Sequence, residues 1–385
     1  MKKITLTLAA LFMLLFSVNA QITEKEKAEK YINDKGELTF TFQVQQNADV
    51  ENLTQNMSLV HYDPNTRIVK AWANTAQFRQ FETLNIDYIV PTSENEVDEA
   101  TIYDVRPLAT RSITANSGVN GVNASTLTFP LSSYPTYAEY AQQMQDFEND
   151  YPSLVEKISI GSTGQNDGKE LLFVKISDNV STDEQEPKIM LTSSMHGDEI
   201  AGYPMMLTLI DYILTVYSNT GHADHARVKN LVENAEIWIN PSANPDGTYH
   251  NSANNTSVVQ ARRGNGNNID LNRNYPDNVA GDHPDGEVYQ TETIAFMALA
   301  DAENFIISAN FHGGTELVNY PFDNAYSAQY IHPDNDWFEY IGVEYATHCQ
   351  TDAVAGNSST PTYTNKASYM TDDDDWDENA GNQAW

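Results

Sequence analysis

The chain has 385 residues, of which 40% are hydrophobic and 19% are charged. This length and composition fit a folded protein of about two domains, and they exclude a wholly disordered or collagen-like chain. Acidic residues number 54 against 21 basic residues, so the formal net charge is −33. Because so acidic a surface repels phosphate groups, we expect no nucleic-acid partner and no attraction to anionic lipid.

Residues 1–20 have the pattern of a secretory signal peptide. Lys2 and Lys3 precede a mostly apolar stretch, and small residues lead up to Ala20, where a signal peptidase would cut. A membrane anchor is the alternative, but the stretch is short and no second apolar run of about 18 residues follows it. The sequence therefore predicts a secreted or periplasmic protein with no stable membrane span. Its single cysteine, Cys349, excludes an internal disulfide.

Residues 21–92 are predicted to form a small domain. Leu38, Phe40, Phe42 and Val44 alternate with polar residues, as in a half-buried strand. The order of elements expected after them is β-α-β-β-α-β, which predicts a ferredoxin-like α+β domain. Nothing in it looks catalytic, so we expect it to act as a folding or inhibitory prosegment.

Residues 93–132 are rich in Ser, Thr, Asn and Gly, a composition typical of a linker. Arg106 and Arg111 are two of its few charged residues, and they are candidate processing points.

Residues 133–385 are predicted to form the larger domain. A capping box at Thr136 and Glu139 begins a helix. Strands and helices alternate after it, which predicts an α/β domain with a mixed, mostly parallel sheet and helices on both faces. In such sheets the chemistry lies at the carboxyl ends of the strands. His196 and His312 each come directly after a predicted strand. The strands are expected at 157–160, 170–176, 188–193, 236–239 and 305–311, and helices at 204–217 and 291–302.

Three blocks of sequence carry candidate functional residues. The first, Met195–Glu199, offers an imidazole and a carboxylate three residues apart, both of which bind zinc. On its own this spacing is weak evidence, since an exposed histidine beside acidic residues is commoner. The second block, Ala261–Asp277, holds three arginines, which can clamp a carboxylate or simply balance charge. The third, Ile307–Pro321, places His312 before two glycines; a buried structural histidine is the alternative.

Taken together, the blocks resemble the zinc metallocarboxypeptidases, the family of carboxypeptidases A and B. The phrases I-D-L-N-R-N-Y-P-D and S-A-N-F-H-G-G-x-x-x-V-N-Y-P-F-D are close to the branch that includes carboxypeptidases E, D and N. H-G-D-E, and I-N-P-x-A-N-P-D-G at 239–247, fit this branch too. The likeness runs from about residue 134 to about residue 325.

The resemblance implies the reacting groups of the site. His196, Glu199 and His312 would bind Zn²⁺, which activates a water molecule for hydrolysis. Arg263 would polarise the scissile carbonyl and hold the oxyanion. A cation at this position stabilises the negative charge that develops in the transition state.

The resemblance also implies how the substrate is held. Asn272 and Arg273 would grip the free carboxylate of a peptide, which explains why only the chain end would be cut. Asp270 and Asn310 would orient their neighbours rather than react. The expected partners are therefore the C-termini of peptides or proteins.

The sequence departs from the family after Tyr369. Family members carry a tyrosine that covers the substrate, a specificity-pocket residue and a general-base glutamate on a late strand. Asn382–Trp385 resembles the approach to the tyrosine segment, but no strand with a glutamate follows. Glu316 and Asp372–Asp375 are poor substitutes, since the aspartate run is typical of a solvated loop. We therefore expect a C-terminally truncated copy that lacks the general base; a complete relative without catalysis is the alternative.

The sequence thus predicts a zinc-dependent exopeptidase. Two other functions remain open, a non-catalytic zinc- or peptide-binding protein and an amidase or deglutamylase acting on modified peptides. The sequence leaves the side-chain preference at the cleaved residue and the oligomeric state undetermined.

Overall fold

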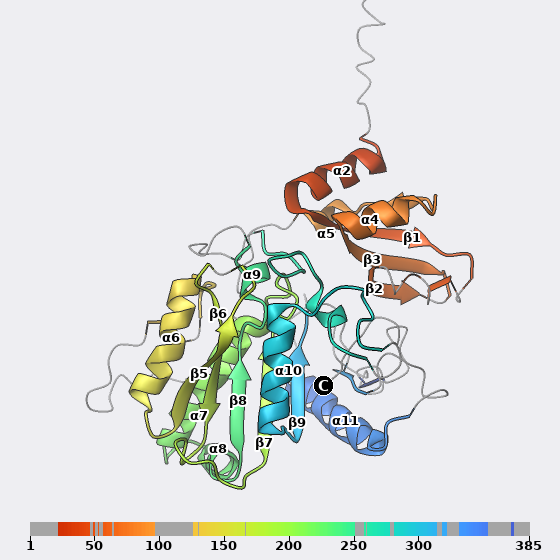
Figure 1. Cartoon of the computed structure of the whole chain (residues 1–385). Helices are drawn as coiled ribbons and strands as arrows, with labels where there is room; N and C mark the ends of the chain where they lie inside the picture. Colours follow the sequence, from red (N-terminus) through yellow and green to blue (C-terminus); the bar gives the residue numbers. More distant parts are fainter. Residues whose placement is uncertain are drawn as a thin grey trace, which may run out of the picture.

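The computed structural model (Figure 1) describes most of both predicted domains. The predicted signal peptide, most of the linker with Arg106 and Arg111, and Glu316 lie outside the described residues, as do 373–385. No helix within the described ranges is both long and apolar enough to cross a membrane. The described residues are 22–46, 49–50, 53, 57–63, 65–96, 126–129, 131–165, 167–250, 258, 260–277, 281–313, 318–321, 331–352 and 371–372.

The small domain is built on an antiparallel sheet with the strand order β2-β3-β1-β4. The four strands lie where the sequence predicted strands. The helix expected near Val50–Met57 is only partly described, so the ferredoxin-like assignment stays a prediction. The elements are α2 (Glu24–Lys35), β1 (Glu37–Gln43), β2 (Ser58–Asp63), β3 (Ile68–Asn74), α4 (Thr75–Glu82), β4 (Tyr88–Ile89) and α5 (Thr92–Asn95).

The two faces of the small sheet differ. Helices α2 and α4 pack on one face, where a core of aromatic side chains includes Phe40, Phe42, Phe78 and Phe81. The other face carries Ser58, Trp72 and Thr39 side by side across β2, β3 and β1. Trp72 is only 2% exposed, although it does not belong to the domain's own core. This face is therefore covered by something other than the helices of its own domain.

The larger domain contains a five-stranded sheet of order β5-β6-β8-β7-β9. β5 pairs with β6 and β6 with β8 in antiparallel fashion, whereas β8, β7 and β9 are parallel. The sheet is thus mixed, and the parallel part lies at the β9 side. Its strands are β5 (Val155–Ser162), β6 (Glu170–Ile176), β7 (Lys188–Ser193), β8 (Glu236–Asn240) and β9 (Ile307–Phe311).

Helices cover both faces of the larger sheet, as predicted. One face packs against α6, α7 and α8 through a core that includes Tyr140, Tyr203 and Val228. The other packs against α10, mainly through Phe296. The remaining elements are short or peripheral. The helices are α6 (Tyr137–Asp150), α7 (Gly202–Ser218), α8 (His225–Val232), α9 (Pro245–Thr248), η1 (Leu271–Arg273), α10 (Thr291–Glu303) and α11 (Asn335–Asp352), with short strands β10 (Val318–Asn319) and β11 (Thr371–Asp372).

Local signals in the sequence account for the start of the larger domain. The Thr136 hydroxyl accepts from the backbone N–H of Glu139, and the Glu139 carboxylate accepts from the backbone N–H of Thr136. This reciprocal cap is the one predicted from the sequence, and it fixes where α6 begins.

The position of the small domain bears on function. The carboxyl ends of β8 and β9 point toward it, and its helix-free face lies against the loops at this end of the sheet (Figure 1).

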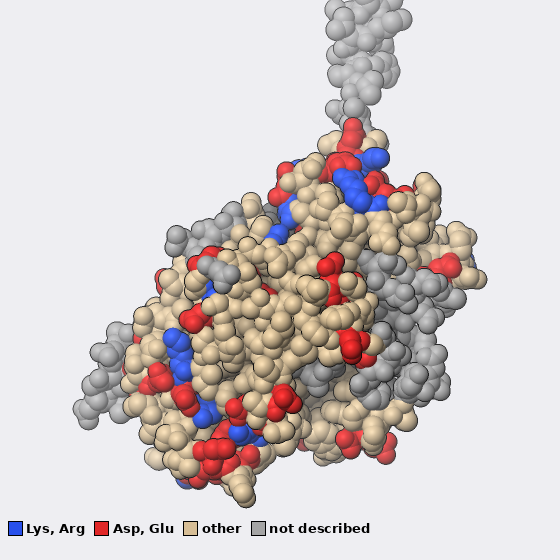
Figure 2. Space-filling view, in the orientation of Figure 1, with Lys and Arg blue, Asp and Glu red and all other residues tan. Residues whose placement is uncertain are grey.

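Acidic side chains outnumber basic ones on the face in Figure 2, but they lie in separate groups rather than in one patch. On this face, therefore, the negative charge does not mark a single binding surface.

Candidate metal centre

The structure brings His196, Glu199 and His312 together. His196 and Glu199 lie in the loop from β7 to α7, and His312 follows β9. Since β7 and β9 are parallel neighbours, their carboxyl ends meet at one edge of the sheet. Nδ1 of His196 is 2.8 Å from Oε1 of Glu199, and Nδ1 of His312 is 2.7 Å from Oε2. One potential ligand atom from each residue lies within 4.8 Å of the others.

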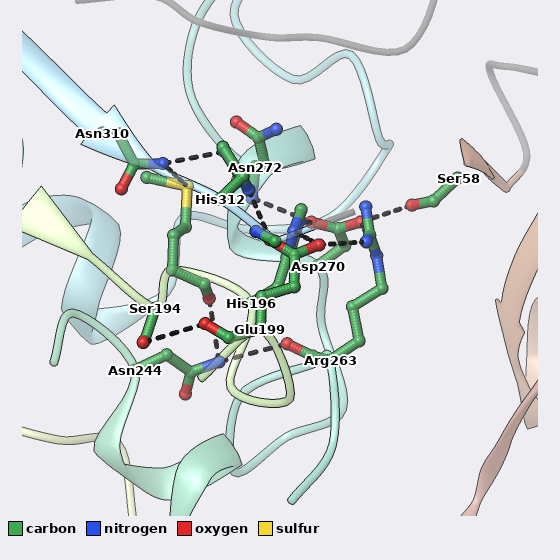
Figure 3. Close-up of polar contacts among 12 residues, drawn as sticks. Ser58, Ser194, His196, Glu199, Asn244, Arg263, Asp270, Asn272, Asn310 and His312 are labelled. Atoms are coloured by element: carbon green, nitrogen blue, oxygen red, sulfur yellow. Dashed lines mark hydrogen bonds and ion pairs between the residues drawn. The ribbon is translucent and has the colours of Figure 1, made fainter. Parts of the chain in front are cut away.

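The second nitrogen of each imidazole has a partner of its own (Figure 3). Nε2 of His196 is 2.9 Å from Oδ1 of Asp270, and Nε2 of His312 accepts from Nδ2 of Asn310 at 2.8 Å. Asn310 in turn accepts from the Thr192 hydroxyl. These contacts hold both rings with Nδ1 toward Glu199. Partners of this kind orient histidine ligands in metal sites.

The charges of the cluster suit a metal ion. Burial raises the pKa of Glu199, but the adjacent imidazoles of His196 and His312 outweigh burial and hold it well below its usual range. Burial and Arg263 lower the pKa of His196, but the carboxylates of Glu199 and Asp270 raise it more. Loss of solvation lowers the pKa of His312, although its side chain keeps 28% of its surface exposed. One ionised carboxylate and two imidazoles form a donor set that fits zinc and leaves a position open.

Arg263 lies next to this cluster and is buried. Its Nη1 donates to Oε1 of Glu199 at 3.2 Å, and its Nε donates to Oδ2 of Asp270 at 3.1 Å. Burial raises the pKa of Asp270, but the charges of Arg263 and His196 hold it well below its usual range. Asp270 therefore stays ionised and contacts both the imidazole of His196 and the guanidinium of Arg263.

Asn272 and Arg273 follow directly from Asp270 in the short helix η1. Oδ1 of Asp270 accepts from the backbone N–H of Asn272 at 2.9 Å and so caps this turn. Nη1 of Arg273 donates to the carbonyl of Asn272 at 3.2 Å, and both side chains are buried. The carboxylate that touches His196 and Arg263 thus also sets the position of the two residues expected to bind substrate.

Asn244 supports the site, a role that the sequence did not reveal. It belongs to the predicted family phrase at 239–247, which gave it no function. Its Nδ2 donates to the carbonyls of Met195 and Arg263, 3.1 and 3.2 Å away. It therefore ties the loop of His196 to the segment of Arg263. These two segments are so close that a Cβ on Gly197 would lie 2.5 Å from the carbonyl oxygen of Arg262.

Three residues of the small domain reach the same site. The Ser58 hydroxyl donates to Oδ2 of Asp270. The Trp72 ring lies under the guanidinium of Arg263, with its centroid 5.6 Å from Cζ. Oε1 of Glu37 accepts from the backbone N–H of Arg263 at 3.1 Å. All three contacts fall on Arg263 or Asp270.

A second set of contacts holds the small domain beside them. The side-chain amide of Asn74 donates to the carbonyl of Asn268, and the amide of Asn268 donates to the carbonyl of Gly36, each at 3.0 Å. The sequence carried no signal for this docking, because strand alternation shows which residues leave the domain's own core but not what covers them. The small domain contacts site residues of the larger domain but contributes none of the three candidate metal ligands. This is compatible with the expectation that it holds no catalytic residue.

Glu37 gives the interface between the domains a pH dependence. Burial, followed by the nearby carboxyl of Asp198, raises its pKa above the ordinary value of 4.5, whereas the backbone N–H of Arg263 and the charge of Arg262 oppose this rise. A carboxyl whose pKa is raised in the folded state stabilises that state below its unfolded pKa, and the stabilisation is lost as the pH rises through the folded pKa. We therefore expect docking to weaken as the pH rises above 4.5.

Glu37→Gln tests this expectation, because glutamine keeps the acceptor oxygen and cannot ionise. The variant should gain stability relative to wild type as the pH rises, by at most about 1.4 kcal/mol per pH unit. Urea unfolding followed from pH 5 to pH 8.5 measures the difference. Glu339→Gln, on the exposed surface of α11, is the matched control. A constant difference between Glu37→Gln and wild type at all pH values would contradict the expectation.

Comparison with known proteins agrees with this geometry. The family model described as zinc carboxypeptidase matches residues 140–384. The chain therefore belongs to the zinc carboxypeptidase family. This assigns the chain to a zinc-dependent family of peptide hydrolases, as the resemblance in its sequence predicted.

Two relatives with named functions are carboxypeptidases. Mouse carboxypeptidase D is 36% identical over 210 residues, which make up 53% of this chain and 14% of that protein. Mouse carboxypeptidase M is 35% identical over 167 residues, 42% of this chain and 36% of that protein. The chain thus matches well under half the length of either relative.

One solved structure shows the shared fold. Carboxypeptidase A from Helicoverpa armigera aligns with a TM-score of 0.55 at 21% identity, over 84% of this chain and 80% of that one. This alignment covers more of the chain than the family model does, so it also includes residues outside 140–384.

Proposed function

We propose that this chain is the catalytic part of a zinc carboxypeptidase that removes C-terminal residues from peptides. The observation that carries the proposal is the convergence of His196, Glu199 and His312 beside the buried guanidinium of Arg263. Glu199 and His312 are 113 residues apart along the chain. Two imidazoles and one carboxylate match the ligand sets of catalytic zinc sites.

His196, Glu199 and His312 would hold the zinc ion. Zinc bound there would lower the pKa of a water molecule and withdraw charge from the scissile carbonyl. Arg263 would stabilise the oxygen on which negative charge develops, and Asp270 would hold both His196 and Arg263 in place. We assign no general base among the described residues.

Asn272 and Arg273 would bind the terminal carboxylate of the substrate. An arginine fork matches a carboxylate in geometry and charge. A buried cationic site of this kind explains selection of chain ends, because a peptide without a free carboxylate would lack the negative charge that this site attracts. Substrates would thus be peptide or protein C-termini, met outside the cytoplasm if residues 1–20 act as the predicted signal.

The small domain would act as a prosegment that covers this site. Support comes from Ser58, Trp72 and Glu37, which contact Asp270 and Arg263 from outside the larger domain. A substrate carbonyl that needs Arg263 would have to displace Trp72. The small domain would therefore hold the site closed until it is released.

Hydrolysis of blocked dipeptides tests the proposed activity. With added zinc, the chain extended at its C-terminus by a segment that supplies the general-base glutamate should release the terminal amino acid from Nα-blocked dipeptides that end in a free carboxylate, and more so after proteolysis of the linker. The same dipeptides with a C-terminal carboxamide are the matched control and should not be cleaved. Arg273→Ala should raise KM more than it lowers kcat, because it removes a substrate contact.

The alternatives predict different results in the same assay. A non-catalytic relative would bind the dipeptide and zinc but release no amino acid. An amidase or deglutamylase would cleave a γ-glutamyl or amide substrate in preference to the α-linked dipeptide. Either pattern would contradict the carboxypeptidase proposal.

A further inference from the structure

Two serines at the carboxyl end of β7 contact the backbone of the segments that carry the metal-binding side chains. Ser193 and Ser194 are both completely buried. They are the last residue of β7 and the one after it, and they precede His196 by three and two positions. Their hydroxyl oxygens lie 3.5 Å apart.

Ser193 connects β7 to the residue before His312. It lies opposite Phe311 in the parallel β7–β9 register, and its hydroxyl donates to the Phe311 carbonyl at 3.3 Å. A Cβ on Gly202, at the start of α7, would lie 2.0 Å from the same hydroxyl oxygen. The hydroxyl therefore lies between the end of β9 and the start of α7, in space that the absence of a side chain at Gly202 leaves open.

Ser194 connects β7 to Glu199. Its hydroxyl donates to the Glu199 backbone carbonyl at 3.1 Å, across the loop that contains His196 (Figure 3). Ser194 has a φ of +56°, in the left-handed region that favours glycine or asparagine. A serine is strained there, and strain of this kind persists only where the surroundings hold the residue in place. The hydroxyl contact to Glu199 gives a reason for a serine at a position that suits glycine better.

The two halves of the loop are held by different backbone contacts. Met195 is held through its carbonyl by Asn244, and the N–H of Gly197 donates to the carbonyl of Arg263 at 3.2 Å. These contacts fix the first half of the loop. The Ser194 bond and the Glu199 N–H to His196 carbonyl bond, at 3.1 Å, fix the second half.

We propose that Ser193 and Ser194 are positioning residues that set the distance between the Glu199 carboxylate and the His312 imidazole in the zinc site. The inference rests on the proposed function of the three ligands. One hydroxyl fixes the backbone of the carboxylate ligand and the other fixes the backbone leading to the imidazole, and both start from the same strand end. The pair thus relates two ligands that are distant in sequence to one rigid element.

Zinc affinity and the spectrum of the cobalt-loaded chain test the proposal. Ser193→Ala, Ser194→Ala and Ser194→Gly should each weaken zinc binding about 10-fold in competition with a chelator, as loss of contacts to metal ligands commonly does. The visible absorption bands of bound Co²⁺ should shift, since they report ligand geometry. Ser194→Gly relieves the backbone strain, so it should fold even if Ser194→Ala does not.

Ser177→Ala is the matched control. Ser177 is a buried serine that follows β6, at the opposite end of the sheet, and its hydroxyl accepts from the N–H of Asn179. It should leave both zinc affinity and the cobalt spectrum unchanged.

The possible outcomes separate this inference from the proposed function. Wild-type affinity and an unshifted cobalt spectrum in Ser194→Gly and Ser193→Ala would overturn the inference and leave the zinc site intact. The same losses in Ser177→Ala would also overturn it, because they would show a general effect of removing a buried hydroxyl. A wild-type chain that binds no zinc would overturn both.

Discussion

His196→Ala and His312→Ala should each abolish stoichiometric zinc binding, whereas the wild-type chain should bind one zinc ion. Three protein ligands are the usual minimum at a catalytic zinc site, and removal of one leaves an ionised glutamate with a single imidazole. The affinity should fall by at least 100-fold. Dialysis against zinc followed by metal analysis measures the stoichiometry, and competition with a chelator measures the affinity.

His225→Ala is the control for this prediction. His225 begins α8 at the opposite end of the larger sheet, where its Nδ1 lies 3.1 Å from the carbonyl of Val216. This variant should bind zinc as wild type does. One tightly bound zinc ion per chain in His196→Ala or His312→Ala would show that the ligands have been assigned wrongly.

Trp72→Ala should open the site. Trp72 is buried by the larger domain rather than by its own core, so its loss should weaken docking and spare the fold of the small domain. Truncation of a buried interface tryptophan commonly costs 2 kcal/mol or more, which corresponds to about a 30-fold larger fraction of open molecules. The rate at which a chelator removes zinc should therefore rise about 30-fold, and binding of a blocked dipeptide should strengthen in parallel.

Thr41→Ala is the control for site opening, because Thr41 lies further along β1 than Glu37 and Thr39. It should leave the rate of zinc removal unchanged. An unchanged rate in Trp72→Ala and in the double variant with Glu37→Ala would contradict the proposal that the small domain closes the site.

Much of the fold could be predicted because its signals are local. The Thr136 capping box, the alternation at Leu38–Phe42 and the buried strand before His196 each depend on residues close together in the chain. Helix α8 and helix α2 escaped prediction, although Thr23 and Glu26 form a capping box that the sequence displays. The identity of the general base is not decided by the structure, because Glu316 and residues 373–375 lie outside the described residues.

The candidate ligands were predictable for a different reason. His196 and His312 follow strands, and strand ends in an α/β sheet converge by geometry. The spacing to His196 offered Glu199, and the family phrases then supplied Arg263, Asn272 and Arg273; the roles of all four as ligands or substrate contacts remain proposals. The sequence also suggested that Asp270 and Asn310 orient their neighbours, and the structure places them beside His196 and His312.

The sequence by itself determined the residue types at the site and the elements that carry them, because capping, alternation and strand-end placement operate over a few residues. Only the tertiary structure decided that Ser58 meets Asp270 across 212 positions of the chain, that Trp72 lies under Arg263, and that Ser194 takes a positive φ to reach Glu199. These contacts depend on how two packed domains and neighbouring strands are placed relative to one another. No local pattern encodes such placement, since it results from the burial of surfaces that are distant in sequence.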